Sequence, residues 1–535
     1  MTKLSTTPIQ FGKGHTVGID LGTTYSTLAQ VSDQGEPIPI PNEDDDVETA
    51  SLILLAESGH VIVGPNRNRA AIEKPENVVE RIKRHMGATA FKRTFDGHEI
   101  TPEFISALIL KKLKRDCEQK IGAIANAVIT VPYYFNDTRR KATQDAGQIA
   151  GLNVIDIINE PTAATLTYAW HRGELGIAHS PDFKKRRVLI YDLGGGTFDS
   201  TLVEYTPTHF HVLATDGDVE LGGIDWNDRI LTYLCDEFKD KHGLDPRESA
   251  QMVQVLRNDC DLAKIELTQR TDVVMSCRHE GKALTVRLTR DKFNELTADL
   301  LQRTIDTTDF VLEQTQLKYS DLDAIVLIGG STLMPQVRER LKEHTGIAPY
   351  IHADLDPHTA VARGAAIHAA ILEARYHAGD SRFGDRVKKL LVGIRQEDVN
   401  SHGLGIVAMD PRMKKAINHI MIPRNTTLPF EVTQTFQTNK ENQTRVSVQV
   451  LEGDAPDPIA CSLLGKCTIT NLPPHLNKGT PVDVTYSFDK NGRISVNAKE
   501  KMSGQEAVIE IERRGTLTDQ QVNSFTQLAS EYTVE

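Results

Sequence analysis

A short pattern occurs twice in this chain and restricts its possible folds more than any other feature. An apolar run ends at Asp20 and is followed by Leu-Gly-Thr-Thr, and a second apolar run ends at Asp192 and is followed by Leu-Gly-Gly-Gly-Thr. In each copy, a stretch typical of a buried strand ends at a carboxylate, and the next turn is nearly free of side chains. One copy would be an ordinary strand and turn. Two copies indicate two similar halves that share a ligand.

The segments around these copies predict an α/β region. Apolar strand runs alternate with helical stretches from residue 16 to about residue 375, which is typical of sheets flanked by helices. The expected strands are 17–20, 126–131, 188–192, 200–204, 211–214 and 324–328. The expected helices are 102–120, 137–150, 226–242, 249–266, 291–316 and 359–375. We therefore expect two α/β halves that face one cleft.

The sequence pattern changes after residue 376, where the alternation of strand and helix runs ends. A polar segment at 377–389 is a candidate linker, and short alternating strands with turn signals follow from about 398 to 512. The sequence Asp-Lys-Asn-Gly-Arg between two alternating runs predicts a hairpin, and a Thr-x-x-Asp cap opens a final short helix. We divide the chain into an N-terminal extension 1–15, a nucleotide-binding domain 16–380, a linker 381–397, an all-β domain 398–513 and a short helix 514–535.

Length, charge and cysteine content exclude several classes of protein. A chain of 535 residues is too long for one ordinary core, and a net charge of -12 argues against a nucleic-acid partner. We find no apolar run long enough for a membrane span and no signal-peptide pattern at the N-terminus. The scattered cysteines, of which Cys461 and Cys467 are the closest pair, complete no zinc pattern. We expect reduced thiols and a cytoplasmic protein.

Glycine-rich loops after strands are typical of phosphate sites, because backbone amides and threonine hydroxyls approach the phosphate closely. This chain has such loops at 20–24, 192–197 and 329–332. Asp20, Asp192 and Asp199 would repel a bare triphosphate, but they suit a hydrated Mg²⁺ that bridges phosphates. Any one of these aspartates could instead serve as a turn former or cap. That explanation is poor for three aspartates beside Gly-Thr loops.

Several longer motifs occur in a fixed order and closely resemble the heat shock protein 70 (DnaK-type) chaperone family. The motifs are GIDLGTTYS, VPYYFND, INEPTAA, YDLGGGTFD, LGGIDWNDR, LIGGSTLMP, IPRNTTLP, LLGKCTITNLPP and FDKNGRISVNA. The resemblance extends from about residue 16 to 533. It implies an actin-like ATPase domain joined to a β-sandwich that binds extended apolar peptides. It also implies ATP/ADP and Mg²⁺ as cofactors. The implied partners are unfolded clients, a J-domain co-chaperone and a nucleotide exchange factor.

The resemblance also assigns roles to individual residues. Asp20 and Asp192 would hold the hydrated Mg²⁺, and Glu160 and Asp199 would act on the attacking water. Pro132 and Arg140 correspond to the pair that relays nucleotide state in the family, although Pro132 could simply end a strand. The catalytic set is Asp20, Thr23, Glu160, Asp192, Thr197 and Asp199. The nucleotide-binding set is Gly22, Thr23, Thr24, Tyr25, Gly194, Gly195, Gly196, Thr197, Gly222, Gly223, Asp261, Lys264, Thr268, Gly329, Gly330 and Ser331.

The chain departs from the family pattern on both sides of the nucleotide. On the adenosine side, Asp261 replaces the usual Glu, while Ile265 and Leu333 occupy places that are often Arg. These two apolar side chains lose the cation–π stacking on adenine, so we expect weaker adenosine binding. On the phosphate side, an ungapped count places Asn68 where the family has a lysine that assists hydrolysis.

Asn68 cannot neutralise charge on a phosphate as lysine does. Arg67 and Arg69 flank it. They are either solvated or reach into the site after a shift of the loop. In the second case the planar guanidinium group would have to approach the phosphate from a different direction than a lysine ammonium does. We therefore expect weak ATP hydrolysis.

The linker and the β region depart from the pattern as well. Gln396 and Glu397 stand directly before Asp398 and Val399, where the family has a short run of Leu. An earlier apolar patch at 390–392 either docks on the ATPase domain or ends a strand.

In the β region, Met409, Asn439 and Val446 fall at positions that line the family's peptide groove. Met and Val in a β-sandwich are also ordinary core residues. The short helix at 514–535 replaces a long lid, so we expect fast release of peptide.

The sequence favours an ATP-dependent chaperone whose peptide affinity is controlled by nucleotide. One alternative is a nucleotide-gated holdase that binds ATP with little hydrolysis. A second alternative is a small-molecule kinase or a filament protein with an actin-like fold. The β-sandwich motifs and the NEPTAA segment argue against the second alternative.

Overall fold

The computed structural model describes most of the chain. The described residues are 9–56, 59–64, 72, 74–88, 90–91, 93–176, 183–350, 352, 354–377, 382–410, 412–470, 472, 476–488, 494–510 and 517–535.

The first half of the α/β region is built around the strand that ends at Asp20. Strand β1 (His15–Asp20) pairs in parallel with β10 (Ile124–Val131) and antiparallel with β2 (Tyr25–Val31). The sheet order is β11-β10-β1-β2-β3, with β11 at Asn153–Asn159, β3 at Pro37–Pro39 and β4 (Thr49–Ala50) paired to β2. We call this sheet, with α2 (Pro102–Ile121) and α3 (Asp137–Ile149), the first lobe.

The second half repeats this pairing pattern around Asp192. Strand β12 (Arg186–Leu193) pairs in parallel with β17 (Ala324–Ile328) and antiparallel with β13 (Phe198–Thr206). The sheet order is β17-β12-β13-β14-β18, with β14 at His209–Asp218 and β18 at Arg395–Glu397. We call this sheet the second lobe, together with α5 (Gly223–His242), α6 (Ala250–Gln269), α7 (Arg290–Thr315) and α8 (Pro335–Thr345). All the strands and helices expected between residues 17 and 375 are present.

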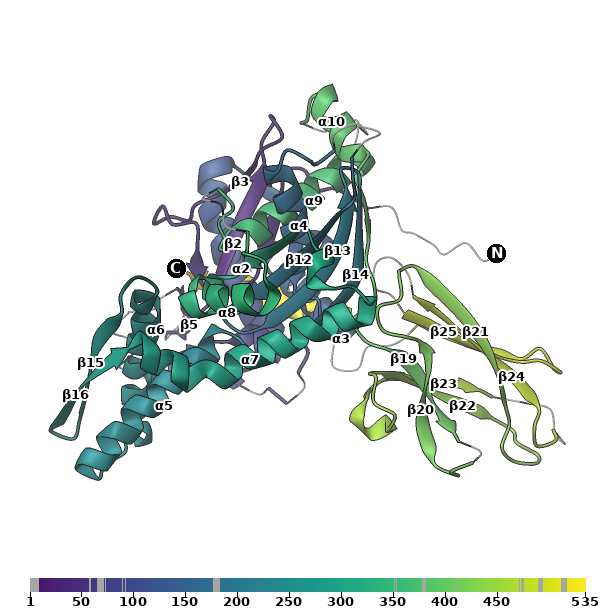
Figure 1. Ribbon diagram of the computed structural model, residues 1–535. Helices are drawn as coiled ribbons and strands as arrows, with labels where there is room; N and C mark the ends of the chain where they lie inside the picture. Colours follow the sequence, from purple (N-terminus) through teal and green to yellow (C-terminus); the bar gives the residue numbers. More distant parts are fainter. Residues whose placement is uncertain are drawn as a thin grey trace.

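Two helices lie between the two sheets. Helices α4 (Glu160–His171) and α9 (Ala360–Tyr376) share one apolar core with residues from both sheets (Figure 1). The backbones approach so closely that a Cβ on Gly364 would lie 1.8 Å from the carbonyl oxygen of Ala163. Glycine is therefore required at this crossing. Because α4 begins at Glu160, the packing between the lobes positions that carboxylate.

The second lobe also carries an antiparallel hairpin at its outer end, and the first lobe carries short strands at its rim. The hairpin is β15 (Asp272–His279) with β16 (Lys282–Thr289). The rim strands are β5 (Ile53–Leu55), β6 (His60–Val63), β7 (Val78–Val79), β8 (Arg93–Phe95) and β9 (His98–Ile100). A 3₁₀ turn, η2 (Ile82–His85), follows β7 and faces the cleft.

The all-β region consists of two four-stranded sheets with a shared core, as expected. The sheet orders are β20-β19-β22-β23 and β21-β24-β25-β26. The expected hairpin is supported by the antiparallel pairing of β24 with β25, while its turn at 489–493 lies outside the described residues. The strands are β19 (Leu404–Met409), β20 (Ala416–Ile422), β21 (Phe430–Gln437), β22 (Val446–Glu452), β23 (Ser462–Ile469), β24 (Pro481–Phe488), β25 (Ile494–Glu500) and β26 (Glu506–Glu510).

The linker is structured and lies against both lobes. The apolar patch at 390–392 does not end a strand, because it forms the last turn of helix α10 (Asp385–Val392), in which Leu391 is buried. Strand β18 then adds in parallel to β14. Directly after it, Thr162 donates a hydrogen bond to Asp398 at 3.0 Å. Tyr133 exchanges hydrogen bonds with the backbone of Val399 at 2.8 and 2.9 Å.

The last described segment packs on the first lobe. Helix α11 (Asp519–Glu531) and β27 (Thr533–Val534) lie against α2 and α3, and β27 pairs in parallel with β6. Tyr532 is 5% exposed and contacts Phe104 with ring centroids 5.9 Å apart. Lys111 donates to the carbonyl oxygen of Tyr532 at 2.9 Å. The expected C-terminal helix therefore forms, and it belongs to the core of the first lobe.

Candidate nucleotide site

The two glycine-rich turns face each other across the cleft. A Cβ on Gly195 would lie 1.9 Å from Oγ1 of Thr24, and a Cβ on Gly196 would lie 2.4 Å from the side chain of Thr23. A third loop closes in behind them, because Ser331 donates to the carbonyl oxygen of Gly194 at 2.9 Å. The glycines are needed because the two halves meet backbone to side chain at this point.

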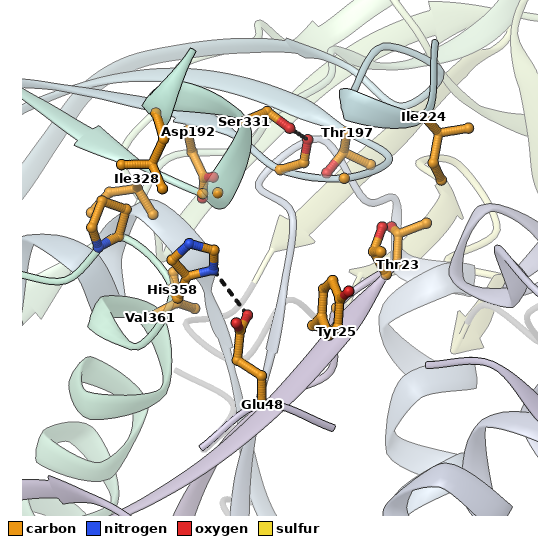
Figure 2. A pocket seen from close by; sticks show the side chains of 18 of the residues that line it. Thr23, Tyr25, Glu48, Asp192, Thr197, Ile224, Ile328, Ser331, His358 and Val361 are labelled. Carbon is orange, nitrogen blue, oxygen red and sulfur yellow. Dashed lines mark hydrogen bonds and ion pairs between the residues drawn. The ribbon is translucent and has the colours of Figure 1, made fainter. Parts of the chain in front are cut away.

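The turns open onto a cavity of about 330 Å³ between the lobes (Figure 2). The cavity is lined by sixteen of the residues that the sequence assigned to the site. These are Asp20, Gly22, Thr23, Thr24, Tyr25, Glu160, Asp192, Gly194, Gly195, Thr197, Asp261, Lys264, Thr268, Gly329, Gly330 and Ser331. The other expected residues, Gly196, Gly222, Gly223 and Asp199, are not among the residues that line the cavity. A cavity of this size fits a nucleotide.

Carboxylates gather at one end of the cavity. Asp20 ends β1 and accepts a hydrogen bond from Thr130 at 3.1 Å, and Glu160 is the first residue of α4. Asp192 is the register partner of Asp199 in the β12–β13 ladder. Glu160, Asp192 and Asp199 are buried, and Asp20 is half-buried.

Burial and like charge shift the protonation of this cluster. Burial, together with the charge of Glu160, raises the pKa of Asp20 to about 7 and the pKa of Asp199 to about 8. The same causes raise the pKa of Asp192 well above its usual range. These carboxylates therefore resist being ionised together unless a cation lies close to them.

One cation in this cluster was missed by the sequence analysis. Nζ of Lys83, in η2, lies 2.6 Å from Oε1 of Glu160, and the Lys83 side chain is 6% exposed. Burial lowers the pKa of Lys83, but Glu160 and Asp20 outweigh that effect, and the net pKa is raised. Lys83 is thus a charged lysine inside the cavity. Its burial depends on distant partners, so no local pattern in the sequence distinguishes it from the exposed lysines.

The next residue of η2 crosses to the second lobe. Arg84 donates to the carbonyl oxygen of Gly196 at 2.7 and 2.9 Å and pairs with Asp225 at 2.6 Å. The turn that carries Lys83 is therefore attached to the second phosphate loop. The sequence analysis placed the family's lysine position at Asn68. Asn68 and its neighbours Arg67 and Arg69 lie outside the described residues.

The donor set at the carboxylate end of the cavity fits Mg²⁺. Oδ1 of Asp199 and Oγ1 of Thr24 are buried and have no hydrogen-bond partner among the described residues. Buried polar atoms normally have partners. A hydrated Mg²⁺ requires oxygen ligands whose negative charge is only partly neutralised by neighbouring protein groups.

The far end of the cavity is less polar and suits a nucleoside. Lys264 donates to the carbonyl oxygen of Gly223 at 3.1 Å and pairs with Asp261 at 3.0 Å. Asn227 donates to Asp261 at 2.9 Å. Ile265 and Leu333 line this end, and Ile265 is 49% exposed, so it is free to cover an aromatic base.

A second contact missed by the sequence analysis closes one side of the cavity. Nδ1 of His358 lies 2.9 Å from Oε1 of Glu48 (Figure 2). This hydrogen bond raises the pKa of His358. Glu48 precedes β4 of the first lobe and His358 precedes α9, so the contact joins segments far apart in the sequence.

The three residues expected in a peptide groove all belong to the all-β region. Met409 ends β19 and is 57% exposed. Val446 begins β22 and is half-buried, and Asn439 is exposed in the loop before it. The recorded β19–β22 pairing covers only Leu404–Ile406, so Met409 and Val446 both lie beyond the paired part of these antiparallel strands.

Fold and site together define a two-lobed phosphate-binding protein with an attached β-sandwich. A family model described as Hsp70 protein matches residues 16–535. The chain is 38% identical over 528 residues to the chaperone protein DnaK of Thermosipho melanesiensis. The aligned region covers 97% of this chain and 84% of that protein. The chain belongs to the Hsp70 family and is an ATP-dependent molecular chaperone. Among the described residues, no helix is long and apolar enough to cross a membrane.

Proposed function

We propose that the lobes form an actin-like ATPase that controls the affinity of the β-sandwich for extended, apolar segments of unfolded clients. The observation that carries this proposal is the position of the linker. Strand β18 extends the same sheet whose β12–β13 turn lines the cavity. A change in lobe angle at the nucleotide therefore acts directly on the strand that leads to the β-sandwich.

Hydrolysis of ATP would take place at the carboxylate end of the cavity. Asp20 and Asp192 would hold hydrated Mg²⁺, which when bound would supply positive charge to the phosphate groups. Glu160 and Asp199 would orient the attacking water and accept its proton, and Thr23 and Thr197 would donate hydrogen bonds to phosphate oxygens. The remaining loop residues would cradle the phosphates and the adenosine, as the resemblance implies.

Lys83 would supply the positive charge that Asn68 cannot supply. It lines the cavity, stays protonated and holds Glu160 in place. A fixed, buried cation near the transferred phosphate stabilises charge that develops in the transition state. This chain would then hydrolyse ATP with its lysine on η2.

Communication between the domains would pass through Pro132 and Arg140. Pro132 directly follows strand β10 and precedes Tyr133, and Tyr133 contacts Val399, two residues after β18. Arg140 donates to the carbonyl oxygen of Ile157 at 3.1 Å and also contacts Asn159, the residue before Glu160. The relay would thus connect the catalytic carboxylate with the linker. Met409, Asn439 and Val446 would contribute to the peptide site.

The family relationship supports two further proposals. The protein would work with a J-domain co-chaperone and a nucleotide exchange factor, and it would act in the cytoplasm. Neither the kinase nor the filament alternative is favoured by any contact among the described residues.

The test is the release of a fluorescent extended apolar peptide from the full chain, with ADP and with ATP. ATP should speed release about 5–150-fold, the usual range of allosteric coupling. Tyr133→Phe should reduce this ratio because it removes the hydroxyl that contacts the linker, whereas the exposed Tyr376→Phe should not. Release at one rate in both nucleotides would contradict the proposal. Fast release with ATP but no ADP formed would favour the holdase.

A further inference from the structure

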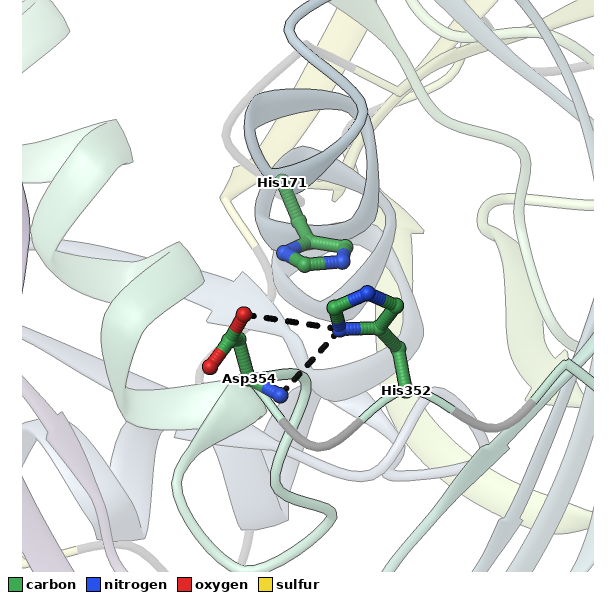
Figure 3. Close-up of side chains that lie close together, drawn as sticks. All are labelled: His171, His352 and Asp354. Atoms are coloured by element: carbon green, nitrogen blue, oxygen red, sulfur yellow. Dashed lines mark hydrogen bonds and ion pairs between the residues drawn. The ribbon is translucent and has the colours of Figure 1, made fainter.

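Three metal-ligating side chains converge away from the nucleotide cavity. His171 is the last residue of α4, and His352 and Asp354 lie in the segment that leads to α9. One ligand atom from each of the three lies within 4.8 Å of the other two (Figure 3). Two nitrogens and one carboxylate oxygen from two separate segments form a chelating set rather than a run of neighbouring charges.

The three side chains are held in place by their surroundings. The ring of Tyr350 packs edge-on against the buried Tyr168, with centroids 5.1 Å apart, and also lies 6.3 Å from the ring of His171. The rings of His171 and His352 are 4.3 Å apart. The backbone N–H of Asp354 donates to Nδ1 of His352 at 3.3 Å, which keeps the His-x-Asp pair in a compact turn.

An ordinary ion pair explains only part of this arrangement. Oδ2 of Asp354 lies 3.6 Å from Nδ1 of His352, but that nitrogen already accepts the backbone N–H of Asp354, and His171 has no carboxylate of its own in this group. Two imidazolium rings at this separation would repel each other, whereas two neutral imidazoles can share a metal ion. The exposed side of the group leaves room for a water ligand.

The charges nearby favour a particular class of metal. Arg363 donates to the carbonyl oxygen of Asp354 at 3.1 Å, and Arg172 pairs with Glu174 at 3.2 Å beside His171. Both arginines are engaged by other oxygen atoms, and the group offers only one carboxylate, whereas hard ions such as Ca²⁺ and Mg²⁺ depend on several oxygen ligands. Imidazole nitrogens with one carboxylate suit zinc and similar transition metals.

We propose that His171, His352 and Asp354 form a surface site for Zn²⁺ or a similar divalent transition metal, with water as the fourth ligand. The site would join two segments that also reach the nucleotide cavity. Helix α4 begins at Glu160, and the segment after Asp354 continues to Pro357 and His358, which line the cavity. A metal that links the far ends of these segments would therefore change nucleotide affinity, and nucleotide would change metal affinity by the same factor.

The binding test uses the metal-free full chain with saturating Mg²⁺ and ADP, so that the carboxylates of the cavity are already engaged. Calorimetry with Zn²⁺ should give one site per chain, and Co²⁺ should give the visible spectrum of a tetrahedral ion. His352→Ala and Asp354→Asn should each weaken binding at least about tenfold. His98→Ala, at an exposed histidine on β9, should have no effect. Both exposed ligands can be changed without opening the core.

Two results would overturn the site. One is the absence of a tetrahedral Co²⁺ spectrum, and the other is equal Zn²⁺ affinity in the parent and all three variants. The coupling is tested separately by measuring ADP affinity with and without Zn²⁺. A shift in the parent that is absent in His352→Ala would support the coupling, and an unchanged ADP affinity in a chain that binds Zn²⁺ would refute it. Neither result depends on peptide binding.

Discussion

The two halves of the nucleotide-binding region have the same strand pairing but different chemistry. Asp20 and Asp192 end equivalent strands, yet the register partner of Asp20 is Thr27, whereas the register partner of Asp192 is Asp199. The first lobe also carries Glu160, at the start of α4, and Lys83, in η2, and neither residue belongs to the repeated strand and turn. We therefore expect the repeated turns to hold phosphate and metal, and we expect Glu160 and Lys83, which lie outside the repeated pattern, to act in hydrolysis together with Asp199.

The halves also differ in what they bind from the rest of the chain. The second lobe takes the linker strand β18 at the edge of its sheet, and the first lobe takes α11 and β27. Segments on both sides of the β-sandwich are therefore attached to the nucleotide-binding region, one to each lobe. A change in the angle between the lobes would act on the β-sandwich from two sides.

The largest expected effect is at Lys83, and it tests whether hydrolysis depends on the unrepeated residues. Lys83→Met should lower the single-turnover rate of ATP hydrolysis by about 10²–10³, because a preorganised charge is lost from the transition state. Lys264→Met, in the second lobe, should mainly weaken nucleotide binding. Both variants need thermal melts to show that they fold.

Asn68 provides a sharper form of this experiment. If Lys83 does the work of the family's usual lysine, Asn68→Lys should restore hydrolysis in the Lys83→Met chain but add little to the parent. A Lys83→Met chain that hydrolyses ATP at the parent's rate would show that another group, such as Arg67 or Arg69, supplies the charge.

The next effect is on the stability of the first lobe. Tyr532→Ala should cost about 3 kcal/mol of folding free energy, because it removes a buried aromatic ring from the contact with Phe104. The control Tyr376→Ala removes a tyrosine that is 51% exposed and should change stability little. Thermal or urea unfolding measures both. Equal melting curves for Tyr532→Ala and the parent would show that α11 and β27 do not form part of this core in solution.

A smaller effect is expected where the two repeated turns meet. Gly195→Ala would place a Cβ 1.9 Å from Oγ1 of Thr24, whereas Gly194→Ala would meet nothing closer than 3.6 Å. We expect about tenfold weaker ADP binding for Gly195→Ala, from a forced shift worth about 1.4 kcal/mol, and little change for Gly194→Ala. Similar affinities for the two variants would mean that the turns do not meet in the nucleotide-bound protein.

The smallest effect concerns pH and the contact between His358 and Glu48. A histidine whose folded pKa is raised adds stability below its unfolded pKa, and that stability is lost as pH rises through the folded pKa. His358→Gln should therefore remove a contribution of about 1 kcal/mol or less that the parent has at acidic pH and lacks at alkaline pH. Thermal melts across this pH range measure the difference, with His98→Gln as the control.

Asp20 and Asp199 titrate in the same range and act in the same direction. Their folded pKa values of about 7 and about 8 mean that the nucleotide-free protein binds more protons than the unfolded chain between the ordinary aspartate pKa of 3.8 and these values. Its stability should fall as pH rises toward pH 8 and then level off. Mg²⁺ with ADP should flatten this dependence. The difference in stability between the parent and His358→Gln isolates the contribution of the histidine. Equal stability at every pH would show that His358 makes no such contribution.

Much of the molecule follows from local patterns in the sequence. The repeated Asp-Leu-Gly turns, the alternation of strands and helices and the alternating β region predicted the two lobes, the all-β region and the glycine-rich loops of the cavity, whereas Glu160, Asp261, Lys264 and Thr268 were assigned through the family resemblance. These features are local, because side-chain periodicity and glycine turns depend on residues a few positions apart.

Tertiary structure alone decided the rest. Lys83 and Glu160, Glu48 and His358, and Tyr532 and Phe104 are far apart in the sequence, and none of these pairs has a local signature. The patch at 390–392 is apolar in any conformation, and its contacts with the α9 side of the core make it the end of a helix. In the sequence Lys83 resembles an ordinary surface lysine. In the fold it is buried in the cavity and stays charged, because carboxylates from distant strands and helices surround it.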